Sequence, residues 1–448
     1  MDYDILIIGA GPGGYETAAE AARQGLNTAI VERGFVGGTC LNHGCIPTKA
    51  LCHCAQVLRT VRSAEAYGIG CGTVTADYSA AARHKAAVVE QLRQGVTQLM
   101  SAPGITLING EASIADAHTV SIDGGKQTLT ASHIVIATGS EPRNLPIPGA
   151  DLAMTSGEAL AMTRLPRQMC VIGGGVIGME FAGIFAAYGV EVTVVEYCKE
   201  ILPPFDKDVA KRLRTVLQKQ GVKFITQAAV TAIGRTAAGL TVSYDLKGKP
   251  QQLECQKALM AVGRQPVLPE GLEQAGVAVG RRGIEVDSHM MTSVPGIYAI
   301  GDVNGQCMLA HAATAQGMVA LAHITGKESA VKPGIVPSAV FTQPELAMVG
   351  LTEEQCKAQE LDVTVKKGFF RSNGKALSMG ETDGLLKMIV SNTDRTIVGC
   401  HICGPHASDL IQEVVMAMNA GSTVGDLAAS IHGHPTLSEA VQAVARQF

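Results

Sequence analysis

Two cysteines five positions apart are the residues of this sequence best suited to chemistry. Cys40 and Cys45 lie in the stretch GGTCLNHGCIPTK, residues 37–49. Pro47 suits the first turn of a helix, so Cys45 is expected at a helix N-terminus, where unpaired N–H groups and the helix dipole favour a thiolate. Lys49 would add a positive charge on the same helical face. The pair can therefore close a small disulfide ring and exchange with other thiols.

The spacing of the two cysteines alone leaves other interpretations open. Two small buried residues beside a loop, or half of a metal site, would give the same pattern. No second Cys/His pair follows at zinc-finger spacing, so we predict no metal site. The motifs on either side of the pair favour redox chemistry.

A glycine-rich turn precedes the cysteines. Residues 4–8 (DILII) are expected to form a buried parallel strand, followed by a helix over about 15–23 and a second strand over 28–32 that ends at Glu32. In this context the glycines allow close approach to a pyrophosphate, the helix N-terminus supports its charge, and Glu32 accepts hydrogen bonds from an adenosine ribose. The turn predicts a dinucleotide site and consists of Gly9, Ala10, Gly11, Pro12, Gly13 and Gly14.

The same arrangement occurs a second time. The strand CVI leads into GGGVIG, then a helix, then the strand EVTVVE, which ends at Glu196. Gly9 to Glu32 spans 23 residues, as does Gly173 to Glu196, so the two units are offset by 164 at both landmarks. This is an internal duplication of a nucleotide-binding unit. Two dinucleotide sites and a dithiol in one chain indicate a flavin and a nicotinamide that exchange hydride.

The acidic residue of the second unit indicates which nicotinamide binds there. Glu196 suits the free 2′-hydroxyl of NAD and would repel the 2′-phosphate of NADP. Lys199 lies three residues on, but no arginine pair is near, so we predict NAD. The dithiol belongs to the first unit, which we therefore expect to hold FAD.

Length and composition narrow the class of protein. A chain of 448 residues is expected to form two to four domains, and 46% hydrophobic with 17% charged residues is typical of a well-buried globular protein. The net charge of −4 argues against nucleic acid as a partner, and no stretch approaches the ~20 apolar residues of a membrane span. The first residues run straight into a strand, leaving no room for a targeting peptide. Twelve scattered cysteines suggest a reducing compartment, so we expect the cytoplasm.

An ordered series of motifs shows that the chain resembles the pyridine nucleotide–disulfide oxidoreductases over nearly its whole length. The motifs are GGTCLNHGCIPTKAL (37–51), IVIATGS (134–140), GGGVIGME (173–180), AVGRQP (261–266), TSVPGIYAIGD (292–302), VPSAVFTQPELAMVG (336–350) and HGHPTLSEA (432–440). The resemblance implies an α/β fold with two Rossmann-like, three-layer dinucleotide-binding domains and a C-terminal α+β interface domain. The implied segments are 1–147 for FAD, 148–262 for NAD, 263–333 for the second part of the FAD domain and 334–448 for dimerisation.

The resemblance also implies roles for individual residues. Cys45 would face the flavin as the charge-transfer thiolate, and Cys40 would exchange with substrate. Lys49 would lie near flavin N5 and pair with Glu180, which could otherwise be a solvated helix residue. Asp302 would hold the ribityl hydroxyls, although an Asp there also suits a simple turn. The implied FAD positions are Gly9, Gly11, Pro12, Gly13, Gly14, Glu32, Thr39, Lys49, Thr138, Gly139, Asp302 and Ala310, and the implied NAD positions are Gly173, Gly175, Ile177, Gly178, Glu180, Glu196 and Gly263.

The C-terminal motif contains a histidine and a glutamate with an implied catalytic role. A single loop histidine is usually structural, but His434 in HPTLSE resembles the family's acid–base group, with Glu439 orienting the imidazolium. Family members place this histidine on the partner subunit, which implies a homodimer with two shared sites. The helix expected over 410–420 is amphipathic and suited to partner contact.

Within the family, CIPTKAL is closer to the enzymes that act on lipoamide than to the CVPKK form of glutathione reductases. The implied activity is oxidation of protein-bound dihydrolipoamide with reduction of NAD+ through the dithiol and FAD. A lipoyl-bearing protein of a 2-oxoacid dehydrogenase or glycine cleavage complex would be the partner. The alternatives are an NADPH-dependent reductase of small disulfides, a mercuric reductase-like enzyme and a non-catalytic subunit. Mercuric reductases end in a cysteine pair, whereas this chain ends VARQF.

Four further cysteines are expected to be structural. Cys400 and Cys403 lie on a predicted strand. Because successive side chains of a strand point to opposite faces, these two cysteines would also point to opposite faces. Cys52 and Cys54 stand where the family usually has apolar residues. Cys52 shares a helical face with Cys45, which leaves a secondary thiol role open.

Overall fold

The computed structural model describes all 448 residues and confirms the predicted α/β class. The chain divides into two compact units. The first comprises Met1–Ala50, Ala82–Arg143 and Arg264–Pro333, and the second comprises Leu51–Ala81, Asn144–Gly263 and Gly334–Phe448.

A seven-stranded sheet forms the centre of the first unit, with the order β3-β2-β1-β6-β5-β4 and β18 paired to β6. The pairs among β3, β2, β1, β6 and β18 are parallel, and those of β5 with β4 and β6 are antiparallel. The strands are β1 Tyr3–Ile8, β2 Thr28–Glu32, β3 Ile105–Asn109, β4 Ala112–Ile114, β5 Thr119–Ile122, β6 Gln127–Ile136 and β18 Ile297–Ala299. The smaller pairs in this unit are β7 Ser140–Pro142 with β15 Arg264–Pro266, and β16 Val279–Gly280 with β17 Gly283–Ile284.

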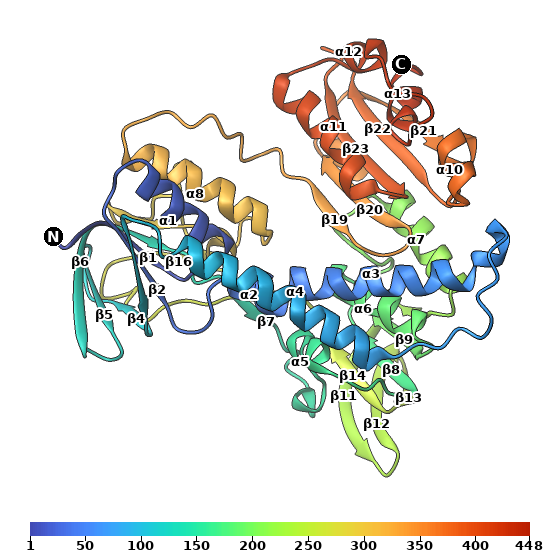
Figure 1. Ribbon diagram of the computed structural model, residues 1–448, viewed down its shortest axis with the longest axis horizontal. Helices are drawn as coiled ribbons and strands as arrows, with labels where there is room; N and C mark the ends of the chain where they lie inside the picture. Colours follow the sequence, from blue (N-terminus) through green and yellow to red (C-terminus); the bar gives the residue numbers. More distant parts are fainter. The chain divides into compact units, whose positions relative to one another are not determined.

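The side chains of β1 alternate between two hydrophobic layers. Ile5 and Ile7 share a core cluster with α1 (Pro12–Arg23) and α8 (Ala310–Ile324), whereas Leu6 and Ile8 belong to the cluster on the other face. This is the period-2 pattern of a strand buried on both faces. Helices α1 and α8 lie side by side (Figure 1). Their close approach depends on small residues, because a Cβ at Gly317 would lie 1.9 Å from the Thr17 hydroxyl.

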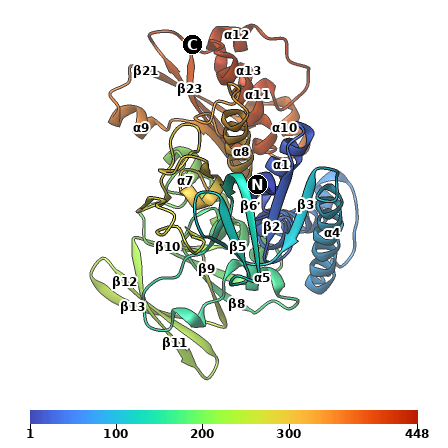
Figure 2. The ribbon, with the colours of Figure 1, turned by 90° about the vertical axis from the view of Figure 1, so that its left-hand side faces the viewer.

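The second unit repeats the parallel arrangement on a smaller scale. Its four-stranded parallel sheet has the order β10-β9-β8-β14. A three-stranded antiparallel meander, β11-β12-β13, lies between β10 and β14 in the chain (Figure 2). The strands are β8 Gln168–Ile172, β9 Glu191–Glu196, β10 Lys223–Thr226, β11 Ala228–Thr236, β12 Gly239–Leu246, β13 Lys249–Cys255 and β14 Lys257–Met260. The accompanying helices are α5 Ser156–Ala161, α6 Val176–Ala187 and α7 Lys207–Lys219.

The C-terminal part of this unit is a five-stranded antiparallel sheet, in the order β19-β20-β23-β22-β21. Its strands are β19 Ser338–Val340, β20 Glu345–Gly350, β21 Val363–Phe369, β22 Leu385–Ser391 and β23 Ile397–Gly404. Its helices are α9 Glu353–Ala358, α10 Gly374–Met379, α11 Ala407–Ala420, α12 Val424–Ala429 and α13 Glu439–Ala445. On β23, Cys400 and Cys403 are fully buried in different core clusters, so the prediction that they point to opposite faces is confirmed.

A buried ion cluster joins this sheet to the N-terminus of α7. The Lys387 ammonium contacts Asp206 and Asp208 at 2.8 Å and Glu353 at 2.7 Å, while Lys367 contacts Asp208 at 2.7 Å. Lys387 is 2% exposed and Asp206 is 0% exposed. Burial acts to lower the pKa of Lys387, but the three carboxylates outweigh it and raise that pKa. Folding therefore depends on keeping these opposite charges together.

Most elements agree with the sequence predictions. The strands over 28–32 and 191–196 match β2 and β9, and the two expected helices begin three residues earlier than predicted, at Pro12 and Ala407. The short helix α2 (Gly38–His43), which contains Cys40, was not predicted. None of the helices combines the length and the apolar character that a membrane crossing requires.

Candidate functional site

The two glycine turns have the same geometry. Gly9 and Gly173 both have φ of +104°, a backbone region that favours glycine. A Cβ at Gly14 would lie 1.9 Å from the Gly9 carbonyl oxygen, and one at Gly178 would lie 2.1 Å from the Gly173 oxygen. Glycine at these positions therefore lets strand and helix approach more closely than any other residue would allow. The helix N-terminus, that of α1 in the first unit and of α6 in the second, faces the turn.

The two predicted ribose-binding carboxylates also make equivalent contacts. In the first unit, the N–H groups of Ala10 and Gly34 donate to Glu32 over 2.8 and 2.7 Å. In the second, the N–H groups of Gly174 and Cys198 donate to Glu196. Each donor pair is offset by the same 164 positions. The carboxylates are thus oriented by the glycine turns themselves and keep further lone pairs for ribose hydroxyls.

The segment that precedes the dithiol lies directly on the first glycine turn. The N–H of Gly37 donates to the Ala10 carbonyl over 2.7 Å. A Cβ at Gly38, whose φ is +56°, would lie 2.7 Å from the Gly11 Cα. The chain then forms α2, which contains Cys40, and α3 (Cys45–Arg62), which begins with Cys45. The helix start predicted at Cys45 is therefore present, and tertiary contact joins the cysteine segment to the nucleotide turn.

The thiols of Cys40 and Cys45 lie in hydrogen-bond contact. Both side chains are half-buried. The hydrogen bond to Cys45 is the main cause that raises the pKa of Cys40, burial adds to it, and Lys49 opposes it. Cys40 thus retains its proton more tightly, so the negative charge of the pair is expected on Cys45, at the helix N-terminus.

Asp302 is part of a polar network that crosses the first unit. The Arg264 side chain donates from Nε to Ser140 Oγ over 2.7 Å and from Nη2 to the Ser140 carbonyl over 2.5 Å. Ser140 Oγ donates in turn to Asp302, whose carboxylate lies 4.0 Å from Arg264. The pKa of Arg264 is lowered, because the effect of burial outweighs the opposing effect of the negative charges of Asp302 and Cys45. A carboxylate oriented in this way can accept hydrogen bonds from hydroxyl groups of a ligand, so it is more than a turn former.

The residues of the first unit suit FAD, the cofactor that the motifs imply. The turn and the Gly37–Gly38 segment expose backbone where a Cβ could not be placed, as close approach of a pyrophosphate requires. Glu32 and Asp302 supply carboxylates that can accept hydrogen bonds from ligand hydroxyl groups, and the dithiol lies in the segment packed on the turn. The predicted position Thr138 is held by a hydrogen bond from its Oγ1 to the Val267 carbonyl, over 2.6 Å. Strand β7, which follows Gly139, pairs antiparallel with β15, which follows Gly263.

The remaining predicted cofactor positions have less specific surroundings. Thr39 is exposed on α2, Lys49 is half-buried on α3, and Ala310 begins α8. Glu180 is 3% exposed on α6, where its Oε1 accepts from the Phe341 N–H over 3.0 Å, so the alternative of a solvated helix residue is wrong. The expected ion pair between Lys49 and Glu180 stays a prediction.

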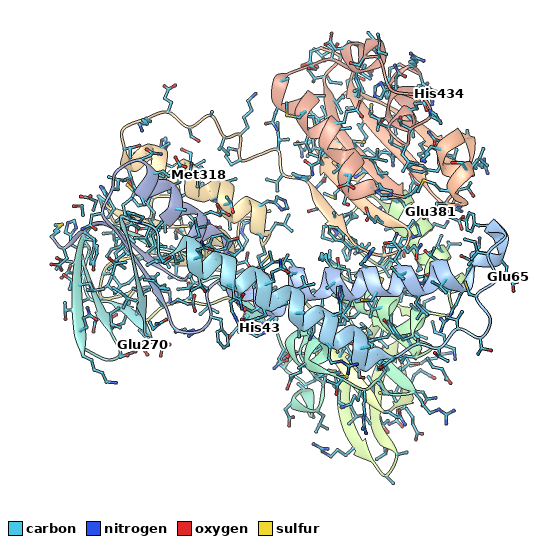
Figure 3. The ribbon with its side chains drawn as sticks, viewed as in Figure 1. His43, Glu65, Glu270, Met318, Glu381 and His434 are labelled. Atoms are coloured by element: carbon cyan, nitrogen blue, oxygen red, sulfur yellow. The ribbon has the colours of Figure 1, made fainter.

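His434 and Glu439 are brought together as predicted. His434 Nδ1 lies 2.9 Å from Glu439 Oε1, and the histidine side chain is 80% exposed among the C-terminal elements (Figure 3). The backbone N–H of Thr436 also donates to Glu439, over 2.8 Å. That bond, then the His434 contact, lowers the pKa of Glu439, so the carboxylate stays ionised beside the imidazole.

Comparison with known proteins identifies the family. The description "Pyridine nucleotide-disulphide oxidoreductase" applies to residues 3–317, and the dimerisation domain of the same family matches residues 336–445. This chain belongs to the pyridine nucleotide–disulfide oxidoreductase family. The resemblance inferred from its motifs is thereby confirmed, and the dimerisation domain supports the predicted homodimer.

Individual relatives in this family cover almost the whole chain. Dihydrolipoyl dehydrogenase from Geobacillus stearothermophilus is 41% identical over 98% of this chain and 94% of its own length. Dihydrolipoyl dehydrogenase from Mycobacterium bovis is also 41% identical, over 98% and 97%. Among solved structures, the HOCl-induced flavoprotein disulfide reductase RclA from Escherichia coli superposes with a TM-score of 0.88 at 31% identity, covering 99% of both chains.

Sequence reasoning missed several residues that the structure brings to these sites. Ser140 ends the motif IVIATGS and Arg264 lies in AVGRQP, but neither was predicted to contact Asp302. Cys54 is packed in the core of the second unit with Tyr78 and Tyr188, whose rings meet edge to face at 5.2 Å. Burial raises the pKa of Cys54, as expected for a structural thiol.

Proposed function

We propose that this chain is a dihydrolipoamide dehydrogenase, which oxidises protein-bound dihydrolipoamide and reduces NAD+. The observation that supports this best is the pair of contacting thiols on α2 and α3, in a segment that lies against the first glycine turn. The relatives named dihydrolipoyl dehydrogenase share about two-fifths of their residues with it across nearly the full chain. The four-segment division into FAD, NAD, central and dimerisation parts belongs to the same proposal.

Two turns of the same geometry would hold the two cofactors. Gly9–Gly14 with Glu32 and Asp302 would bind FAD, and Gly173–Gly178 with Glu196 would bind NAD. When bound, FAD accepts electrons from a dithiol and passes hydride to a nicotinamide. The Glu196 carboxylate suits the 2′-hydroxyl of NAD and disfavours the 2′-phosphate of NADP, which argues against the NADPH-dependent alternative.

The residues of the chain would perform the thiol chemistry. A substrate thiol attacks Cys40 of the oxidised pair while His434 of the partner subunit takes its proton, and Glu439 stabilises the resulting imidazolium. The attack breaks the Cys40–Cys45 bond and releases Cys45 as a thiolate. A second thiol of the same substrate then displaces Cys40, which takes the proton held by His434, while the proton of that second thiol passes to His434 in turn. Substrate leaves as its cyclic disulfide, so two thiols are oxidised and the cysteine pair is reduced.

A lipoyl group on a separate protein is the expected substrate, because a lipoyl arm can deliver two neighbouring thiols to the half-buried sulfur of Cys40. Whether that protein belongs to a 2-oxoacid dehydrogenase or a glycine cleavage complex is tested by measuring which lipoyl protein is turned over. The cytoplasm stays the expected compartment, because twelve cysteines scattered along the chain suggest reducing conditions.

Rapid mixing of the FAD-loaded enzyme with dihydrolipoamide tests the proposal. We expect a long-wavelength absorbance from the Cys45 thiolate before NADH appears. Cys40→Ser and Cys45→Ser should abolish dihydrolipoamide oxidation but keep bound FAD and its reduction by NADH. Cys71→Ser, at an exposed cysteine, is the matched control. Wild-type turnover in either variant, or activity confined to NADPH and small disulfides, would refute the proposal.

A further inference from the structure

A second histidine lies two residues before His434, in a very different environment. The side chain of His432 is 6% exposed, whereas that of His434 is 80% exposed. His432 Nε2 lies 2.5 Å from Glu413 Oε1 on α11, and its Nδ1 lies 3.1 Å from the Ser430 carbonyl oxygen. Each of the two histidines in this loop therefore pairs with a glutamate from a helix, but the side chain of His434 is exposed and that of His432 is buried.

Contacts of the buried pair connect α11 to α13, the helix that follows the loop. Ser430 is the acceptor that His432 shares with Gln442 of α13, whose Nε2 also donates to the Ala428 carbonyl over 3.3 Å. Glu413 is on α11 and Glu439 is the first residue of α13. Contacts from Glu413 through His432 and Ser430 to Gln442 thus hold α11 and α13 at a fixed separation beside His434.

His434 has little else to hold it. Its ring has one hydrogen bond, to Glu439, and Gly433 separates it from His432. Within the loop, Thr436 Oγ1 donates to the Gly433 carbonyl over 2.7 Å, and Asn373 donates to the Thr436 carbonyl over 3.0 Å. The first of these bonds spans His434 and the second holds the residue two positions after it, whereas His432 holds the loop two positions before it.

Both partners of His432 are hydrogen-bond acceptors. A backbone carbonyl has no hydrogen to give, and neither does an ionised carboxylate. One ring nitrogen of His432 lies against the Glu413 carboxylate and the other against the Ser430 carbonyl, so both sides of the ring are held in place. The charged groups around it are Glu413 of α11, Glu439 of α13 and, within its own loop, His434.

We propose that His432, held by Glu413, is a positioning residue that sets the location of His434 for proton transfer. The inference rests on the proposed role of His434 as the acid–base group. It assigns no contact with substrate to His432. Positional accuracy matters here because a displacement of about 1 Å in a catalytic group can cost roughly 100-fold in rate.

The test uses the FAD-loaded, full-length enzyme with two separate readouts. His432→Ala should lower kcat with dihydrolipoamide by about 10- to 100-fold, leave KM for NAD+ unchanged and leave flavin reduction by NADH unchanged. His432→Gln, whose amide can still donate to Glu413, should restore part of the loss. His432→Ala combined with Glu413→Ala should cost no more than the first change alone, because the pair acts as a unit.

A matched control is available at the start of the same helix. His406 directly precedes α11. Its side chain pairs with that of Asp409 at 3.5 Å, and both side chains are exposed. His406→Ala should leave both readouts unchanged. Wild-type dihydrolipoamide turnover in His432→Ala would overturn the inference, as would a parallel loss of reduction by NADH, which would indicate a general structural defect.

The reference variant His434→Gln separates this inference from the function on which it rests. Loss of turnover in His434→Gln with wild-type turnover in His432→Ala would remove the positioning role only. Wild-type turnover in His434→Gln would remove the acid–base assignment and the positioning role with it.

Discussion

Replacing Lys387 by methionine should destabilise the protein strongly, because its buried ammonium is the cation that neutralises the buried carboxylate of Asp206. Asp206 is 0% exposed, and without Lys387 its charge would have no opposite charge in contact. Breaking a buried ion pair from one side costs about 3–5 kcal/mol. At about 2 °C of melting temperature per kcal/mol, which is the lower end for domains of this size, the loss is roughly 6–10 °C. Thermal unfolding of the FAD-loaded enzyme, followed by circular dichroism, measures it.

Two further variants separate charge burial from other causes. Lys357→Met removes an exposed lysine that contacts the same Glu353 at 3.1 Å, and should cost less than about 0.5 kcal/mol. Asp206→Asn in the Lys387→Met background should recover part of the loss, because it removes the uncompensated charge and asparagine still caps α7. A melting temperature equal to wild type in Lys387→Met, or a further fall in the double variant, would refute the reasoning.

Three other outcomes are expected. Gly14→Ala should yield protein that purifies without flavin, measured by absorbance, because the added Cβ would lie 1.9 Å from the Gly9 carbonyl oxygen; retention of FAD would contradict the tight turn. Glu196→Arg should raise KM for NAD+ and lower KM for NADP+, and unchanged values would show that the carboxylate does not select the nicotinamide. Burial acts to raise the pKa of Asp208, but hydrogen bonds from Lys367 and Lys387 outweigh it and lower that pKa to about 2. The ionised Asp208 carboxylate therefore stabilises the fold above pH 3.8, its ordinary pKa, and this stabilisation is lost as the pH falls toward about 2. In Asp208→Asn, the free energy of unfolding should therefore fall less steeply with decreasing pH in this range than in wild type.

Local sequence determined the elements that bind nucleotide and the helix start at Cys45. Apolar runs of five or six residues, a glycine turn and a terminal acid are contiguous, so each strand and turn follows from neighbours in the chain. The offset of 164 indicated a duplicated nucleotide-binding unit, and the structure adds that Glu32 and Glu196 accept from backbone N–H groups at equivalent positions. His434 and Glu439 were paired because HPTLSE resembles a motif of the family, and the structure brings their side chains into contact.

Tertiary structure alone decided the contacts between residues far apart in the chain. Ser140 and Arg264 meet across 124 positions, Lys387 and Asp206 across 181, and His432 and Glu413 across 19. No local sequence pattern indicates the partner of a lysine in an apolar strand. The same is true of a histidine beside a catalytic histidine. The physical reason is that hydrogen bonds and ion pairs depend on distance in space, and folding brings these side chains together only after strands and helices have packed.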